Sequence, residues 1–386
     1  MITYGRQSID KKDILSVTKV LRSEYLTQGP YVEKFETSLK KYFSCKSAIA
    51  VSSGTAALNL ILSAINLKKN DIVFVSPITF LSSANCILKS GAIPYFVDIN
   101  MNDYSIDLNL LKNEIIKLKK KNKNPKAVIV TDYAGHPADW PELKKIKNKF
   151  GLKLINDNCH SIGASINKNK GYAVKYADFV SLSFHPVKNI TTGEGGAILT
   201  NKPNYEKLFK SLRTHGVVRE KKTLKRKGPW YYEMKYLGDN YRMSDIHASL
   251  GVSQIKKIEK FLKKRRLIAK FYNKIFDKDE RFKIPNIKKN FTHSYHLYPL
   301  LLNMKKIKMS KKQIFEKFFK NKIKLQVHYI PIIYQPYYKK IKKYKSELQN
   351  TKEFYDRQIS LPIYYDLSLD KLKYIKKVCL KIFNIK

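Results

Sequence analysis

Short apolar segments alternate with helix-like segments over the first 210 residues, and this alternation limits the possible folds more than any other feature of the chain. The run DIVFV at 71–75 ends close to Pro77, as a short buried strand does, whereas the apolar residues that follow SSGT at 52–55 recur at helical spacing. Further strand-like runs lie at 92–98, 126–135, 152–158, 177–184 and 195–201. Short apolar strands that alternate with helices predict an α/β fold with a mostly parallel central sheet, covered by helices on both faces.

The C-terminal part of the chain carries a second, shorter series of the same kind. A long helical stretch is expected from Ser244 to about Phe276, and the periodicity then breaks over 275–293. The elements expected beyond the break are strands at 296–302 and 324–330 and helices from about Ser310 and Leu369. We therefore predict a large domain at 1–275, which includes the N-terminal segment and the long connecting helix, and a smaller α/β domain at 276–386.

The composition excludes several classes of protein. With 43% hydrophobic and 12% aromatic residues among 386, the chain can bury a full core, which excludes wholesale disorder. Its four cysteines are widely spaced and form no C-x-x-C pair, so a disulfide scaffold and a cysteine zinc knuckle are excluded and no metal site is expected. The N-terminus shows no apolar signal region, and no apolar run reaches the ~18 residues of a membrane span. We therefore expect a cytoplasmic protein without a membrane partner.

The net charge is extreme, because 76 Lys and Arg against 31 Asp and Glu give +45. Such a charge can indicate a basic nucleic-acid-binding protein, and this class remains an alternative. However, the lysines are spread through nearly every expected helix, as at 144–150 and 256–266, and the chain has no RNP aromatics, zinc fingers or arginine-rich arm. Lys, Asn and Ile are abundant together, which is typical of an AT-rich genome. We therefore expect a small anionic substrate, and no nucleic acid.

Two segments carry residue types that can bind a phosphate or another ligand. In SSGTAALNLIL, at 52–62, small polar residues precede a helix whose first N–H groups and dipole favour a phosphate, although an ordinary N-cap gives the same pattern. Asp157 ends an expected strand, at the edge of the sheet where ligands bind in open α/β folds, although a turn aspartate is a common alternative. His160 follows three residues later, as a ring partner or as a structural histidine.

The segment SLSFHPVKNITTGEGGAIL, at 181–199, carries the strongest candidate for covalent chemistry. A strand with Ser183 leads into a Pro-containing turn with Lys188, and a Gly-rich turn follows. Among 76 basic residues a single lysine has little claim to a catalytic role, but Lys188 follows a strand end and has few charged neighbours. A lysine in such a confined polar site can have a lowered pKa and act as a Schiff-base nucleophile.

Taken together, these motifs resemble the DegT/DnrJ/EryC/StrS family of pyridoxal 5'-phosphate (PLP)-dependent sugar aminotransferases over nearly the whole chain. The motifs that carry the resemblance are LTQGPYVEKFE (26–36), SSGTAAL (52–58), PITFLSSANCI (77–87), SFHPVKNITTGEGGA (183–197), RTHG (213–216), LGDNYRMSDIHASLG (237–251) and VHYIPI (327–332). No single motif is specific, but the set is. The resemblance implies a fold-type I PLP-dependent transferase and a transaminase activity.

Within this family the chain is most similar to the UDP-4-amino-4,6-dideoxy-N-acetyl-β-L-altrosamine transaminases of pseudaminic acid biosynthesis. The similar stretches lie at 2–10, 131–140, 294–302 and 325–338. The similarity implies transfer of an amino group from L-glutamate to the C4 keto group of a UDP-linked 4-keto-6-deoxy-N-acetyl hexosamine. A 4-aminotransferase for another nucleotide sugar, of the perosamine or bacillosamine type, remains an alternative. A PLP sugar dehydratase is disfavoured, because such relatives have histidine in place of the Schiff-base lysine.

The resemblance assigns cofactor roles to eight residues. Lys188 matches the lysine that forms the Schiff base with PLP, and Asp157 matches the aspartate that pairs with the pyridinium nitrogen, where a carboxylate keeps the ring an electron sink. The other matches are Gly54, Thr55 and Ser183 to the phosphate, Phe80 to a stacked aromatic ring, His160 to a contact with the 3-oxygen, and Asn240 to a phosphate contact in the neighbouring subunit. Many relatives have Gln at the position of His160, and without the family Phe80 would be assigned to the core.

The resemblance also implies a homodimer with shared active sites, because Asn240 would complete the site of the neighbour. The residues that match substrate-binding segments are Tyr4, Glu24, Tyr25, Leu26, Thr27, Gln326, Val327, His328 and Tyr329. Arg242 is assigned either to the carboxylate of the amino donor or to a substrate phosphate.

Overall fold

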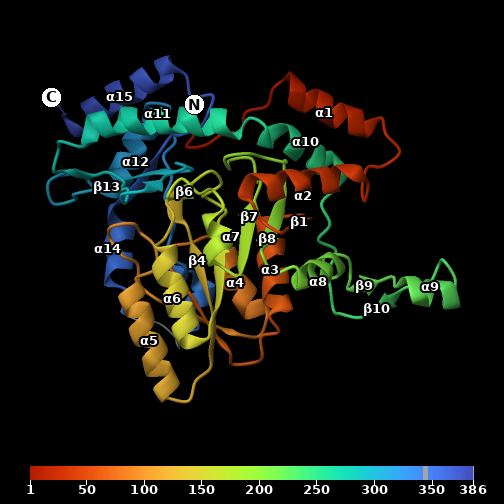
Figure 1. The fold of residues 1–386 in the computed structure, drawn as a ribbon. Coiled ribbons are helices and arrows are strands. Elements are labelled where there is room, and N and C mark those ends of the chain that lie inside the picture. Colours follow the sequence, from red (N-terminus) through yellow and green to blue (C-terminus); the bar gives the residue numbers. More distant parts are fainter. Residues whose placement is uncertain (342–346, 386) are drawn as a thin grey trace.

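The computed structural model of the chain describes residues 1–341 and 347–385 and is built around a seven-stranded sheet of order β1-β8-β7-β5-β4-β2-β3 (Figure 1). Its strands are β1 (Ser47–Val51), β2 (Ile72–Val75), β3 (Ile93–Phe96), β4 (Pro125–Thr131), β5 (Lys153–Asp157), β7 (Phe179–Ser183) and β8 (Gly196–Thr200). The pairings among β2, β3, β4, β5 and β7 are parallel, and β8 is antiparallel to both its neighbours. The predicted mostly parallel sheet is therefore confirmed, with β1 as a strand that the sequence patterns did not single out.

Helices cover both faces of this sheet, as predicted. One face packs against α2 (Pro30–Phe43), α5 (Leu108–Lys120), α6 (Trp140–Phe150), α7 (Tyr172–Tyr176) and α10 (Asp245–Ile255). The other face packs against α3 (Gly54–Ala64), α4 (Ser82–Lys89) and α8 (Asn204–Leu212). Because the strands are buried on both faces, their sequences are continuous apolar runs and do not alternate between apolar and polar residues.

The helical stretch that the sequence predicts from Ser244 to Phe276 is two helices. Ser244 caps α10 as expected, since its hydroxyl accepts the His247 N–H, but α10 ends at Ile255 and α11 (Ile258–Phe276) starts a new axis. At the break, the Lys257 N–H donates to the Gln254 carbonyl in a tightened turn, and the Lys257 ammonium binds the buried carboxylate of Asp13. This buried ion pair is a long-range contact, and helical periodicity does not reveal it.

A smaller three-stranded sheet contains β11 (Phe282–Lys283), β13 (Tyr298–Leu302) and β14 (Gln358–Leu361). It shares a separate apolar core with α11, α12 (Lys311–Lys320) and α15 (Leu369–Phe383). The predicted strand at 324–330 is wrong: this segment makes a single bridge, from Gln326 to Ser360, and then leaves the sheet. The domain boundary near residue 275 stays a prediction, and Ile332 and Tyr338 pack against the large sheet.

The remaining elements are short or peripheral. They are α1 (Lys11–Leu21), the 3-10 turns Tyr133–Gly135 and Ile332–Tyr334, β6 (Ser165–Ile166), β9 (Val217–Val218), α9 (Lys221–Lys227), β10 (Glu233–Met234), β12 (Phe291–Thr292), α13 (Pro336–Lys339) and α14 (Gln349–Arg357). Figure 1 shows β9, α9 and β10 as an arm that projects away from the body of the molecule. None of the described helices combines the length and the apolar character needed to cross a bilayer.

Candidate active site

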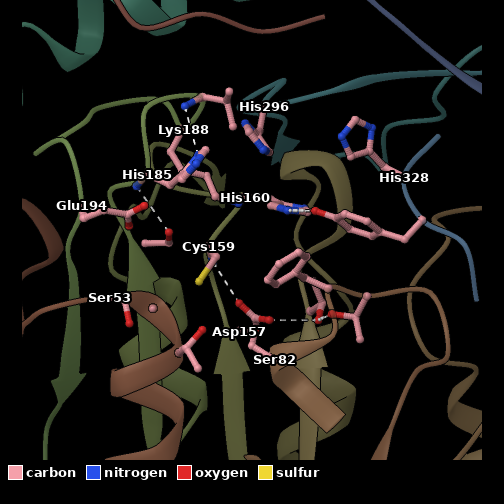
Figure 2. Close-up of a pocket in the computed structure, with 18 of the residues that line it drawn as sticks. Ser53, Ser82, Asp157, Cys159, His160, His185, Lys188, Glu194, His296 and His328 are labelled. Carbon is pink, nitrogen blue, oxygen red and sulfur yellow. Dashed lines mark hydrogen bonds between the residues drawn. The ribbon is translucent and has the colours of Figure 1, made fainter. Parts of the chain in front are cut away.

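A cavity of about 350 Å³ lies at the carboxyl ends of β4, β5 and β7, between the large sheet and the part of the chain that carries the smaller sheet (Figure 2). Most of the predicted site residues line it: Tyr4, Gly54, Thr55, Phe80, Asp157, His160, Ser183, Lys188, His328 and Tyr329. These residues are far apart in the sequence, and the strand ends bring them together. The cavity is therefore at the edge where ligands bind in open parallel sheets.

Asp157 is a buried carboxylate fixed by neutral donors. Its Oδ2 accepts the Ser83 hydroxyl at 2.8 Å and lies 3.5 Å from the Thr131 hydroxyl, and its Oδ1 accepts the Cys159 N–H at 3.3 Å. Thr131 is its register partner on β4. Among the residues that the structure describes, Asp157 makes no ion pair within 4 Å. The carboxylate is thus held in place while its charge remains available to a cationic ligand group.

Lys188 lies half-buried in the turn after β7. The turn is closed on itself, because the Thr191 hydroxyl donates to the Phe184 carbonyl at 2.9 Å and the Phe184 N–H donates to the Gly195 carbonyl at 2.8 Å. Loss of water lowers the pKa of the Lys188 ammonium, and the Asp157 carboxylate partly opposes this effect. Figure 2 shows the lysine and Asp157 facing the same space from different sides. A held amine with a lowered pKa is suited to nucleophilic and proton-transfer chemistry.

The start of α3 forms an anion seat beside this pair. Ser53 is the N-cap, since its hydroxyl accepts the Ala56 N–H at 3.0 Å, so the ordinary N-cap interpretation is correct for Ser53. Gly54 and Thr55 follow in the first turn, where N–H groups have no intrahelical partner. A Cβ on Gly54 would lie 3.0 Å from the Ser183 Cβ and 3.2 Å from the Cys159 sulfur, so a side chain here would require these neighbours to move apart. Helix N–H groups and hydroxyls here can hold a phosphate.

Three buried histidines, His160, His296 and His328, line one side of the cavity. The Tyr329 hydroxyl and His160 Nε2 lie 2.8 Å apart, and His328 Nδ1 lies 2.9 Å from the Ser360 hydroxyl. Burial lowers the pKa of His160 and His296 well below the ordinary value and that of His328 to about 3, and the Lys188 charge adds to each effect. At neutral pH these rings are therefore uncharged, and they offer hydrogen bonds without adding positive charge.

Phe80 lies at the mouth of the cavity and is 54% exposed. The core position that the sequence would suggest for Phe80 without the family resemblance is therefore wrong. Its ring centroid is 6.0 Å from that of Tyr329. Tyr4 approaches His328 edge-on, with centroids 5.0 Å apart. Because the Phe80 ring is this exposed, one of its faces is free to stack on a planar ligand that is bound at the start of α3.

Several predicted residues lie outside this cavity. Arg242 lines a separate cavity of about 400 Å³ together with Arg213 and Glu36. The others outside the cavity are Glu24, Tyr25, Leu26 and Thr27, which are exposed between α1 and α2, the exposed Asn240, and Gln326 and Val327, which precede the lining residue His328. None of these reaches the cavity of its own chain as the structure describes it.

The cavity also contains residues that sequence reasoning left unassigned: Thr79, Ser82, Thr131, Cys159, His185, Val187, Glu194 and His296. Thr131 ends β4 as Asp157 ends β5, so the strand-end argument extended to β4 would have found it. Ser83 carries the shortest bond to Asp157, and nothing in its helical surroundings signals this role. His296 comes from the smaller unit, and only the assembled fold places it near Lys188.

Comparisons with known proteins identify the family to which the chain belongs. The model of the DegT/DnrJ/EryC1/StrS aminotransferase family matches residues 7–379. The chain is 38% identical over 384 residues, which are 100% of the chain and 98% of the relative, to the UDP-4-amino-4,6-dideoxy-N-acetyl-beta-L-altrosamine transaminase of Campylobacter jejuni. Among solved structures it is similar to Helicobacter pylori PseC, an aminotransferase involved in pseudoaminic acid biosynthesis, with a TM-score of 0.89, 32% identity and 99% of each chain covered.

A second solved relative bears on the cofactor. The putative sugar aminotransferase Spr1654 from Streptococcus pneumoniae is solved in a PMP form, with a TM-score of 0.90, 26% identity and coverage of 100% of this chain and 99% of that chain, and also in a PLP form. These likenesses confirm the expected fold of PLP-dependent aminotransferases.

The cavity fits PLP by the chemistry of its own groups. Asp157 is buried without an ion pair, as a partner for a protonated ring nitrogen requires. The α3 start, where a Cβ on Gly54 would intrude, and the hydroxyls of Thr55 and Ser183 would hold the phosphate, and Lys188 presents the amine. When bound, PLP supplies an electron sink for carbanion chemistry.

The first prediction concerns Lys188. When the PLP-loaded protein is reduced with borohydride, we expect a stable pyridoxyl label on the peptide that contains Lys188, and no label in Lys188→Ala, because no other lysine is among the described residues that line the cavity. Mass spectrometry of the digested protein reads out the position. Lys311 is the matched control, since burial lowers its pKa to about 8 outside the cavity, and Lys311→Ala should keep the label. A label of wild-type yield on Lys188→Ala would remove Lys188 from this role.

The second prediction concerns Asp157. Asp157→Ala should lower kcat/KM by orders of magnitude while circular dichroism and the melting curve remain close to wild type, because the ring nitrogen loses its anionic partner. Steady-state kinetics with saturating PLP give the value. A variant within about threefold of wild type, a loss under ~0.7 kcal/mol, would show that Asp157 has no part in the reaction.

Proposed function

The chain belongs to the DegT/DnrJ/EryC1/StrS aminotransferase family, and on this basis we propose that it transfers the amino group of L-glutamate to the C4 keto group of a UDP-linked 4-keto-6-deoxy-N-acetyl hexosamine, in pseudaminic acid biosynthesis. The observation that carries this choice is the 38% identity to the Campylobacter transaminase over the whole chain. The family is PLP-dependent, and the chain is a sugar aminotransferase in which the exact sugar is the proposed part.

In this proposal Lys188 moves the proton. In the first half-reaction, the free Lys188 amine takes the proton from the Cα of the amino donor. In the second half-reaction, Lys188 delivers a proton to C4 of the sugar. Its lowered pKa favours the neutral, proton-accepting form. The closed turn from Phe184 to Gly195 keeps the amine at one place in both half-reactions.

The walls of the cavity are suited to a polar, uncharged sugar ring. The neutral imidazoles of His160, His296 and His328 and the hydroxyl of Tyr329 can donate to or accept from sugar hydroxyls and an N-acetyl group. The net charge of +45 favours the approach of a diphosphate. No described group of three or more His, Cys, Asp or Glu residues could hold a metal ion, and the proposed reaction requires none.

The third prediction tests the substrate. With PLP and L-glutamate, we expect the UDP-linked 4-keto-6-deoxy-N-acetyl hexosamine to be aminated at C4, with 2-oxoglutarate formed in equal amount. NMR of the purified product gives the position and configuration of the amine. Lys188→Ala is the inactive control. Preferential turnover of a GDP-linked sugar would favour the perosamine-type alternative, and amination of a different UDP-sugar would favour the bacillosamine type.

We further propose a homodimer with shared sites. Glu24–Thr27 and Asn240 lie outside their own cavity. Asp245 fixes an edge at residues 24–31, because its two carboxylate oxygens accept the N–H groups of Gly29 and Tyr31, each at 2.7 Å, whereas Asn240 bridges to Thr214. Ser244 pairs with Thr27 in the same edge. Such a fixed, exposed edge is suited to completing a neighbouring cavity.

Exposed apolar side chains support the same assembly. Tyr25 and Leu26 on this edge are 54% and 46% exposed, and Trp230 and Leu237 on the arm are 74% and 89% exposed. Covering this apolar surface in a dimer would remove it from water, which favours association.

The fourth prediction tests the shared site. Mixed and refolded protomers of Lys188→Ala and Asn240→Ala should regain activity, because one of the two sites in each heterodimer would be wild type. Native mass spectrometry confirms that heterodimers form, and Lys188→Ala mixed with itself is the control. Heterodimers that are no more active than the better parent would show that Asn240 serves the cavity of its own chain.

A further inference from the structure

We infer that Asp132 is a positioning residue for Asp157: it holds the end of β5 from the opposite face of the sheet, through both sequence neighbours of Asp157. The inference rests on the proposed role of Asp157 as the partner of the cofactor ring nitrogen. Asp132 itself is fully buried and does not line the cavity. Any effect it has on the reaction must therefore act through other residues.

The carboxylate of Asp132 is the centre of a network of five neutral donors. Oδ1 accepts the Ala138 N–H at 2.8 Å and the Trp140 indole N–H at 2.7 Å, and Oδ2 accepts the side-chain amides of Asn156 at 3.2 Å and Asn158 at 2.9 Å and the Tyr172 hydroxyl at 2.5 Å. Burial raises the pKa of Asp132 to about 6, while the hydrogen bonds from Tyr172, Ala138, Trp140 and Asn156 favour the ionised form. An ionised carboxylate is an acceptor only, as five converging donors require.

The alternation of side chains along β5 places this network and the cavity on opposite faces. Leu154 belongs to the core beneath α6 and α7, whereas Ile155 belongs to the core beneath α3 and α4. Asn156 therefore shares the face of Leu154, and Asp157 shares the face of Ile155. Accordingly Asp157 bonds to Ser83 of α4, while Asn156 bonds to Asp132 on the other face.

Backbone hydrogen bonds of Asp132 connect the network on one face of the sheet to Asp157 on the other face. The Asp132 N–H donates to the Asp157 carbonyl at 3.2 Å, and the Ser161 hydroxyl donates to the Asp132 carbonyl at 3.0 Å. Asn156 and Asn158 are thus tethered on either side of Asp157 by the same carboxylate. A shift of the strand end large enough to move the Asp157 carboxylate would have to break this network, so the network fixes the position at which Asp157 meets a ligand.

The experiment uses Asp132→Asn, whose amide would bring an N–H₂ group against donors that need an acceptor. We expect about a tenfold loss in the affinity of the apoprotein for PLP, measured by fluorescence titration, and about a tenfold loss in kcat, with the KM for the nucleotide sugar within about twofold of wild type. The control is Asp178→Asn. Asp178 is also buried and accepts the Leu154 N–H at 2.9 Å, but it pairs with Lys147 and Lys202 and precedes β7, at the other end of the same sheet.

The outcomes separate positioning from stability. Both variants should melt earlier than wild type, and only Asp132→Asn should lose PLP affinity and kcat. If its PLP affinity and kcat match those of Asp178→Asn, the inference is overturned. If Asp132→Asn does not fold, Tyr172→Phe replaces it, because this variant removes one donor and leaves the carboxylate. Tyr172→Phe should lower PLP affinity and kcat by a smaller factor, and no change in either would also overturn the inference.

Asp157→Asn, measured in parallel, tests the premise. If Asp157→Asn retains PLP affinity and kcat, the proposed role of Asp157 fails. If only Asp157→Asn loses them, the role of Asp132 alone is refuted.

Discussion

The candidate site is centred on the buried carboxylate of Asp157, which makes no ion pair with any residue that the structure describes. Asp157 accepts hydrogen bonds from Ser83 and from the Cys159 N–H, and such neutral donors offset part of the cost of its burial without forming an ion pair. Had a lysine or arginine been placed within hydrogen-bonding distance, the carboxylate would have been satisfied and unavailable to a ligand. The retained charge is also felt by Lys188, where it opposes the stronger lowering of the pKa by burial.

Keeping such a charge in a confined space requires close backbone packing around it. The Gly-rich turn after Lys188 returns the chain to β8, and a Cβ on Gly196 would lie 2.4 Å from the backbone of Ser53. The start of α3 can therefore lie directly against the ends of β7 and β8. The same closeness leaves Cys159 only partly exposed at the cavity, and loss of water raises the pKa of its thiol well above the ordinary value, so that this cysteine remains protonated beside the reactive pair.

The sequence predicted the sheet and the centre of the site because both depend on local pattern. Buried parallel strands appear as apolar runs, and Asp157 ends one such run while Lys188 lies in the turn after another. The failures depended on long-range contacts. At the helix break Lys257 binds Asp13, and in the segment at 324–330 His328 and Tyr329 line the cavity, and no local pattern reveals either contact. His296 was missed for the same reason, since it lies just before β13 and its chemistry depends on what the fold places opposite to it.

The large positive charge has opposite effects on the two associations proposed for this chain. Only 31 acidic side chains are available to 76 basic ones, so ion pairing cannot remove the excess within a protomer. That excess attracts a nucleotide diphosphate toward the cavity but repels a second copy of the chain. A homodimer must therefore gain its free energy from apolar contact. The exposed side chains of Tyr25, Leu26, Trp230 and Leu237 provide apolar surface for this purpose, on the edge and the arm, where few contacts within the protomer use it.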